Sequence, residues 1–254
     1  MIVLGLDTTG DTGSVAVWRT RAGLIATRSF EGARAHSVRL PGELLACLHD
    51  AGLRLGDVDA LGVATGPGSL TGLRVGIATA QGLALALGRP LVAVTALEAL
   101  AAHALSAAGP WSVIGAWINA RRGEVFTALY RRRTGAAGER DTLDEAAAVA
   151  EPPAVADPTV VAERWAEIAA GPSALLVATN SPDGAALVPP VLATAACVVV
   201  APPLAGLVAE LAAVRLERGA SGSPGAVRPL YLRRPDAELG RDRRAAGAGG
   251  GATR

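Results

Sequence analysis

The most informative stretch of the chain is rich in glycine and reads Gly66-Pro67-Gly68-Ser69-Leu70-Thr71-Gly72-Leu73-Arg74-Val75-Gly76. Glycine allows a positive φ or a close approach of the backbone to a neighbour, and proline stiffens the turn. The apolar run before it, residues 60–65, predicts a short buried strand, and residues 73–87 predict a helix of small side chains. The stretch therefore predicts a tight connection from a strand to a closely packed helix.

Two interpretations of this stretch stay open on the residues alone. Ser69, Thr71 and the free N–H groups at the start of the helix can bind an anion, with help from Arg74. The Gly-Lys-Ser/Thr ending of a P-loop is missing, so that nucleotide site is excluded. Alternatively, the glycines serve close packing, and the small residues Ala78 and Gly82 favour a helix–helix contact within the chain or with a partner.

The N-terminal residues predict a hairpin that recurs later in the chain. The strand, turn and strand are residues 2–6, 7–13 and 14–18, and then residues 113–118, 119–123 and 124–131. A repeat of this kind indicates an internal duplication. We therefore expect an α/β fold in two halves, residues 1–104 and 105–235, with a cleft between them. The tail at 236–254 has almost no large apolar side chain, and we expect it to be disordered.

Polar residues in both hairpin turns are candidates for a site in that cleft. The turn after the first strand begins with Asp7, Thr8 and Thr9. A carboxylate at the end of a strand can hold hydrated magnesium, and the amides and hydroxyls of a turn can hold phosphate. Such turns are also common for steric reasons alone, so an inert turn stays open. In the second hairpin, Arg121 and Glu124 are expected to face the cleft.

A second apolar stripe lies on a helix that we expect to begin with Ser37 as its N-cap. The stripe consists of Leu40, Leu44, Leu45 and Leu48. Their spacing is that of one helix face. Further along, residues 95–104 predict another helix, at whose start Thr95 and Glu98 form a capping box.

The composition excludes several classes of protein. Of the 254 residues 50% are hydrophobic and the formal net charge is +1, which excludes a disordered chain and a general attraction to nucleic acid. Cys47 and Cys197 form no CxxC pair, and no histidine is followed by another four residues later, so no metal site is expected. No apolar run approaches the roughly 18 residues of a membrane helix, and no basic leader precedes Asp7. We therefore expect a cytoplasmic protein without membrane contact.

Together, these segments resemble the TsaB (YeaZ) family. The matching stretches are residues 2–9, 36–37 with 40–41, 66–76, 120–126 and 229–233. The resemblance implies the ASKHA fold of actin, sugar kinases and the heat-shock ATPase. The related catalytic TsaD (Kae1) proteins carry two metal-binding histidines spaced i, i+4, whereas here His36 matches the first and Leu40 stands in place of the second. The resemblance thus implies a chain without catalytic or metal-binding residues.

The resemblance also implies partners. Family members form a heterodimer with TsaD and recruit the ATPase TsaE, and the complex transfers a threonylcarbamoyl group to the adenosine next to the tRNA anticodon. The partners would use ATP and magnesium, and this chain would bind no cofactor tightly. The contact would lie on the two N-terminal helices, with the candidates Leu40, Leu44, Leu45, Leu48, Arg74, Val75, Ala78 and Gly82. The resemblance leaves open whether the isolated chain is a monomer or a homodimer.

Two other functions remain as alternatives. An independent ASKHA-type ATPase or kinase is compatible with Asp7, but Asn119 stands where the family usually has aspartate, which weakens a nucleotide role. A vestigial phosphate or nucleotide site would then consist of Asp7, Thr8, Thr9, Ser69 and Thr71. A metalloprotease of the glycoprotease type is less favoured because of the histidine spacing.

Overall fold

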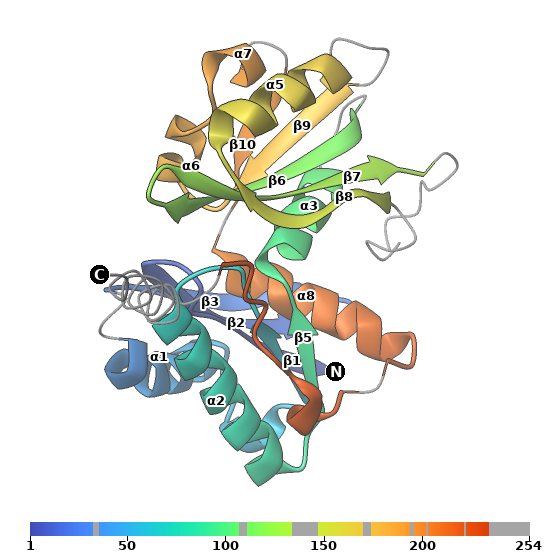
Figure 1. Cartoon of the computed structure of the whole chain (residues 1–254). Helices are drawn as coiled ribbons and strands as arrows, with labels where there is room; N and C mark the ends of the chain where they lie inside the picture. The colour runs from blue at the N-terminus through green and yellow to red at the C-terminus, as the bar shows by residue number, and fades with distance from the viewer. Residues whose placement is uncertain are drawn as a thin grey trace, which may run out of the picture.

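Two five-stranded sheets with flanking helices make up the structure, a computed structural model (Figure 1). It describes residues 1–32, 36–106, 111–133, 147–169, 174–193, 196–201, 203–220 and 222–233. The first half contains β1 (Ile2–Asp7), β2 (Thr12–Arg19), β3 (Gly23–Glu31), α1 (His36–Asp50), η2 (Leu55–Asp57), β4 (Ala60–Ala64), α2 (Leu70–Leu87), β5 (Leu91–Val94) and α3 (Ala96–Ser106). Then follow β6 (Trp111–Arg121), β7 (Glu124–Arg132), β8 (Ala147–Ala156), α5 (Pro158–Ala169), β9 (Ala174–Thr179), α6 (Pro182–Ala186), α7 (Pro190–Ala193), β10 (Cys197–Val200), α8 (Leu204–Glu217) and η3 (Pro224–Ala226). The tail at 236–254 lies outside the described residues.

The two sheets have the same strand order, which confirms the internal duplication. The first runs β3-β2-β1-β4-β5, and the second, read in the matching direction, runs β8-β7-β6-β9-β10. In each sheet the first strand pairs antiparallel with its hairpin partner and parallel with the strand on its other side. The chain therefore has the predicted α/β architecture, two duplicated halves of the ASKHA type.

The helices form layers over the sheets (Figure 1). α1 and α2 cover one face of the first sheet and α8 covers the other, while α3 lies on the second sheet and against α8. Although α8 follows β10 in the chain, its backbone packs directly on β1. Gly5 permits this close approach, since a Cβ added there would lie 2.1 Å from the carbonyl oxygen of Ala205. The range predicted for the second half, 105–235, thus includes a helix that packs on the first sheet.

Three apolar clusters fill the spaces between these layers. The central cluster lies between the two sheets, on α3 and α8, and is rich in alanine. The second lies between the first sheet and α1 and α2, and the third between the second sheet and α5 and α7. In the third cluster the Trp117 and Trp165 rings meet edge to face, with their centroids 5.8 Å apart.

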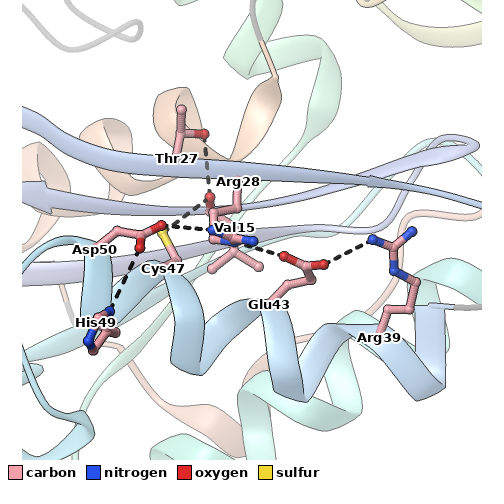
Figure 2. Close-up of polar contacts among 8 residues, drawn as sticks. All are labelled: Val15, Thr27, Arg28, Arg39, Glu43, Cys47, His49 and Asp50. Atoms are coloured by element: carbon pink, nitrogen blue, oxygen red, sulfur yellow. Dashed lines mark hydrogen bonds and ion pairs between the residues drawn. The ribbon is translucent and has the colours of Figure 1, made fainter.

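Ion pairs fasten α1 to the edge strand β3 (Figure 2). Arg28 of β3 donates hydrogen bonds to Glu43 and Asp50 of α1, each at 2.8 Å, and Arg39 donates to Glu43 at 3.0 Å. The hydrogen bonds from Arg28 and then Arg39 hold the pKa of Glu43 below its ordinary value. The side of α1 that faces β3 is therefore occupied by contacts within the chain.

The local predictions hold at one helix start and fail at two other places. The capping box of α3 is confirmed, since Thr95 and Glu98 exchange hydrogen bonds of 2.7 and 3.1 Å. α1 begins at His36, so Ser37 lies within the helix and is not its N-cap. The buried His36 ring packs edge-on against Phe30. The sequence does not predict β8, whose two prolines are unusual in a strand. They are tolerated because β8 is an edge strand and because both prolines fall at a register shift, where neither is paired with β7.

By length and composition alone, α2 could cross a membrane, although Thr71, Arg74 and Gln81 interrupt its apolar residues, as the sequence predicts. Its inner side, with Ile77, Ala80 and Ala84, packs in the cluster beneath the first sheet. A core helix of a packed protein meets the same criterion, so α2 is weak evidence for a membrane span. Among the described residues no second helix meets it.

Gly5→Ala is expected to lower the free energy of unfolding by about 1–3 kcal/mol, because the new Cβ would collide with the backbone of α8. Urea unfolding of the purified chain measures the loss. Gly42→Ala, on the exposed side of α1, is the matched control; nothing lies within 4 Å of its new Cβ, and alanine favours a helix by about 1 kcal/mol. Equal stability of the two variants would contradict the packing of α8 on β1.

Candidate functional site

A pocket of about 670 Å³ lies where the two halves face each other. Its walls include the turns of both duplicated hairpins, the start of α2 and residues 230–233 near the end of the described chain. The duplicated hairpins thus meet at a cleft, as their order in the sequence predicts. Arg121 lines it, whereas Glu124 lies outside its lining.

Asp7 ends β1 at this cleft and is almost fully buried. Its Oδ1 accepts a hydrogen bond of 2.9 Å from the backbone N–H of Thr9. Burial raises the pKa of Asp7, while the hydrogen bonds from Thr9 and the nearby His36 work against that rise. The carboxyl group therefore shapes its own turn, in a setting that disfavours its charge.

The glycines of the 66–76 stretch pack directly on this turn. A Cβ on Gly68 would lie 2.3 Å from the carbonyl oxygen of Thr9, and one on Gly72 would lie 2.0 Å from that of Thr8. On Gly76 it would lie 2.2 Å from the Thr8 hydroxyl, which itself donates to the carbonyl of Gly72 at 2.7 Å. Larger residues would push α2 off β1, so the motif serves close packing within the chain.

The other polar residues of the stretch have separate roles. Ser69 caps α2: its hydroxyl accepts from the N–H of Gly72 at 3.3 Å, and its own N–H donates to the carbonyl of Thr9 at 2.7 Å. Thr71 is exposed and does not line the cleft. Thr9 does line it, and its buried side chain acts on the Asp7 carboxyl group, whose pKa its hydrogen bond lowers. The vestigial phosphate site is thus divided, with Asp7, Thr9 and Ser69 at the cleft and Thr8 and Thr71 away from it.

The turn of the second hairpin copies that of the first without the charge. Asn119 Oδ1 accepts a hydrogen bond of 2.7 Å from the N–H of Arg121, as Asp7 does from the N–H two residues on. Asparagine keeps the accepting oxygen, so the turn survives the loss of the carboxylate. The Arg121 side chain forms an ion pair with Asp11, and Glu124 forms one with Arg233.

A further repeat, which the sequence prediction missed, borders the cleft. Residues 63–65 and 177–179 both read Val-Ala-Thr, and each is followed by a serine that caps a helix three residues before a glycine. In the second copy the hydroxyl of Ser181 accepts from the N–H of Gly184 at 3.1 Å. Asn180, between them, lines the cleft with a buried Oδ1 that has no partner among the described residues. Comparison of the two halves of the sequence at this tripeptide would have found it.

The structure corrects the set of residues predicted for a partner interface. Leu40, Leu44 and Leu48 are buried in the cluster between α1 and the first sheet, so their side chains are not available to a partner. An apolar stripe on a helix that covers a sheet is turned inward by the hydrophobic effect. Leu45, which lies between them in sequence, is 57% exposed.

The outward side of α1 and α2 carries a different set of apolar and small residues. This α1–α2 face consists of the exposed residues Val38, Pro41, Leu45, Ala78, Gly82 and Leu85, with the partly buried Val75 at its edge. The helices lie side by side on the same face of the first sheet, so both stripes point away from it (Figure 1). Arg74 is exposed near the N-terminal end of α2, and its Nε donates a hydrogen bond to the Tyr231 hydroxyl at 3.3 Å.

Metal-ligating side chains do not gather at the cleft or elsewhere in the described residues, where no group of three or more could hold an ion. His36 is buried, and Leu40, four residues on, is buried beside it in the same helix. Cys47 is buried too, and burial raises the pKa of its thiol to about 11. An unreactive thiol of this kind acts as a small apolar group.

Comparisons with known proteins agree with this architecture. The family described as tRNA N6-adenosine threonylcarbamoyltransferase, TsaD, matches residues 30–169, more than half of the chain. The tRNA threonylcarbamoyladenosine biosynthesis protein TsaB of Escherichia coli is 38% identical over 132 residues, 52% of this chain and 56% of that protein. An uncharacterised protein of Mycobacterium leprae is 35% identical over 240 residues, 93% of this chain and 56% of that one. The matched part of the chain thus spans just over half the length of these curated relatives.

A solved structure extends the agreement to the second half. YeaZ from Pseudomonas aeruginosa superimposes with a TM-score of 0.69 at 27% identity, and the match covers 91% of this chain and 99% of that one. Sequence motifs are sparse between residues 133 and 220. The structural match covers 91% of the chain and therefore extends into this region.

Asp7→Asn is expected to raise the thermal unfolding midpoint at about pH 7. Burial puts the folded-state pKa of Asp7 above its ordinary value of 3.8, so the wild-type chain loses stability as the pH rises through the folded-state pKa. Asparagine removes that loss and keeps the oxygen that accepts from Thr9, as Asn119 does toward Arg121. Melting curves from about pH 4 to about pH 8 should show a gain that shrinks toward acid. A lower midpoint at neutral pH would mean that the charge of Asp7 stabilises the fold.

Proposed function

The chain belongs to the TsaB (YeaZ) family, and on that basis we propose that it acts in threonylcarbamoyladenosine synthesis on tRNA as a non-catalytic subunit. In this role it binds a TsaD-like protein and helps to recruit the ATPase TsaE. The partners use ATP and magnesium to transfer the threonylcarbamoyl group to the adenosine next to the anticodon. The chain then works in the cytoplasm and reaches tRNA only through the complex.

The α1–α2 face is the observation that carries this proposal. Val38 and Leu85 are 81% and 71% exposed, and with Leu45 they place large apolar side chains on one outward surface. Exposed apolar surface on a folded chain is typical of a protein interface. Ala78 and Gly82, one turn apart on α2, let a partner helix approach the backbone closely. Two copies of the chain are expected to pair through the same face when the partner is absent.

The chemistry of the cleft supports a non-catalytic role. The space next to Gly68 and Gly72 is filled by carbonyl oxygens of the first hairpin turn, which would repel a phosphate group. The second turn has Asn119 in place of a carboxylate that could hold magnesium. Leu40 stands where a second metal-binding histidine would be required and is itself part of the core.

An independent ATPase or kinase is the second candidate, because the cleft is large enough for a nucleotide. The cleft residue Asn180 has a buried Oδ1 that lacks a partner among the described residues, which favours a polar ligand there. Titration calorimetry of the isolated chain with magnesium-ATP separates the two functions. Micromolar binding with turnover would favour the kinase; a flat titration favours the subunit.

Leu45→Glu and Ala78→Glu are each expected to weaken binding to the TsaD protein of the same organism by about tenfold or more, because each buries a charge at the centre of the interface. Both residues are exposed, so the isolated variants should melt like the wild type. Surface plasmon resonance measures the dissociation constant for TsaD. The tRNA modification activity of the complex should decrease together with the affinity.

Val160→Glu on α5 is the matched control for these variants, since Val160 is also 57% exposed but lies on the other half of the chain. It should bind TsaD like the wild type. If the α1 and α2 variants also bind at full strength, the α1–α2 face is not the interface.

A further inference from the structure

Two ion pairs cross the mouth of the cleft, and both end at the turn of the second hairpin. Asp11, in the turn of the first hairpin, pairs with Arg121. Arg233 pairs with Glu124 and donates to the carbonyl of Ala120 at 3.0 Å. One short turn of the second half is thus held at two points.

Arg233 follows the second half in the chain, but the segment that carries it is attached to the first half. Residues 224–233, here termed the strap, run back along α2 toward the cleft (Figure 1). Gln81 of α2 donates to the carbonyl of Pro224 at 2.8 Å, and the N–H of Leu230 donates to the carbonyl of Thr65 at 2.7 Å. The strap is therefore fixed to the first half, and its last residue reaches across to the second.

The turn held by these contacts has an unusual backbone. Arg121 and Arg122 have φ values of 63° and 59°, and Gly123 follows with 75°. Arg122 and Gly123 are the two central residues of the β6–β7 hairpin, in which Arg121 pairs with Glu124, and positive φ at both is typical of a two-residue hairpin. The hairpin itself therefore fixes the turn, and the ion pairs act on a turn that is already formed.

Behind the cleft, the two halves meet through α3 and α8. The cluster between these helices is rich in alanine, with Ala101 and Ala104 on α3 and Ala209 and Ala212 on α8. Small side chains interlock only shallowly, and packed helices with such surfaces can slide by small amounts. The helix pair therefore provides a contact that can shift by shear at the back of the cleft, opposite the ion pairs.

We propose that the Asp11–Arg121 and Glu124–Arg233 pairs form a clasp that holds the cleft closed, and that the halves open about α3 and α8 when the clasp breaks. The Asp11 and Arg121 side chains are about two thirds exposed, and those of Arg233 and Glu124 are partly exposed. Pairs in such positions are weak and are screened by salt. The clasp therefore holds an equilibrium between a closed and an open cleft, and it controls access to the buried Oδ1 of Asn180.

Distance measurement between spin labels on the two halves tests the clasp. Labels at His49→Cys and Val160→Cys sit on exposed positions of α1 and α5, with Cys197 replaced by serine and the buried Cys47 left in place. Arg233→Gln and Asp11→Asn should each raise the open population about two- to fivefold, as expected for the loss of one exposed ion pair. In the wild type the open population should grow as the salt concentration rises to about 1 M. In the variant that combines Arg233→Gln with Asp11→Asn, the open population should change much less with salt.

A charge swap provides the decisive control. Glu124→Arg combined with Arg233→Glu should return the distance distribution toward that of the wild type, whereas either swap variant alone should open the cleft. Unchanged distances in both neutral variants and across the salt series would overturn the clasp. If a variant fails to fold, the salt series on the wild type decides, because it needs no substitution in the clasp.

Discussion

The contact between the start of α2 and the turn after β1 organises the first half. Gly68 and Gly72 bring the helix so close to the carbonyl oxygens of Thr8 and Thr9 that no side chain fits between them. The Thr8 hydroxyl and the N–H of Ser69 then add hydrogen bonds across the contact. This contact fixes the position of α2. The inner side of the helix therefore covers the first sheet, and its outer side is exposed. The positions of the cleft and of the α1–α2 face both depend on this contact.

Duplication gave two similar sheets, but the connections around them have diverged. In the first half β4 leads into the long α2, whereas in the second half β9 leads into the short α6, although both helices begin with a serine cap before a glycine. α8 returns to the first sheet, where Gly5 and Gly62 admit its backbone. The halves are therefore joined through an alanine-rich layer, and within the part of the chain that the structure describes only the first half presents a pair of long outward helices.

These differences bear on what the chain can do. Groups that would hold a phosphate in the glycine-rich stretch are used for packing, and Asn119 keeps the turn of the second hairpin while it removes the charge. What remains available is apolar surface on α1 and α2 and a cleft whose mouth is bridged by opposite charges. These features are the basis of the proposed role in binding other proteins.

Local pattern was enough to foresee the duplicated hairpins, the α/β class, the capping box of α3 and the close packing of the 66–76 stretch, because turn chemistry and periodicity are written in neighbouring residues. It could not foresee β8, whose prolines are tolerated only at a sheet edge, or the return of α8 to the first sheet. The local pattern also grouped Leu45 with Leu40, Leu44 and Leu48. Neighbouring residues of a helix point about 100° apart, so Leu44 is buried while Leu45 is exposed. Which side of α1 meets the sheet, and which charges meet across the cleft, follows from contacts between distant segments, and these are decided only when the chain is folded.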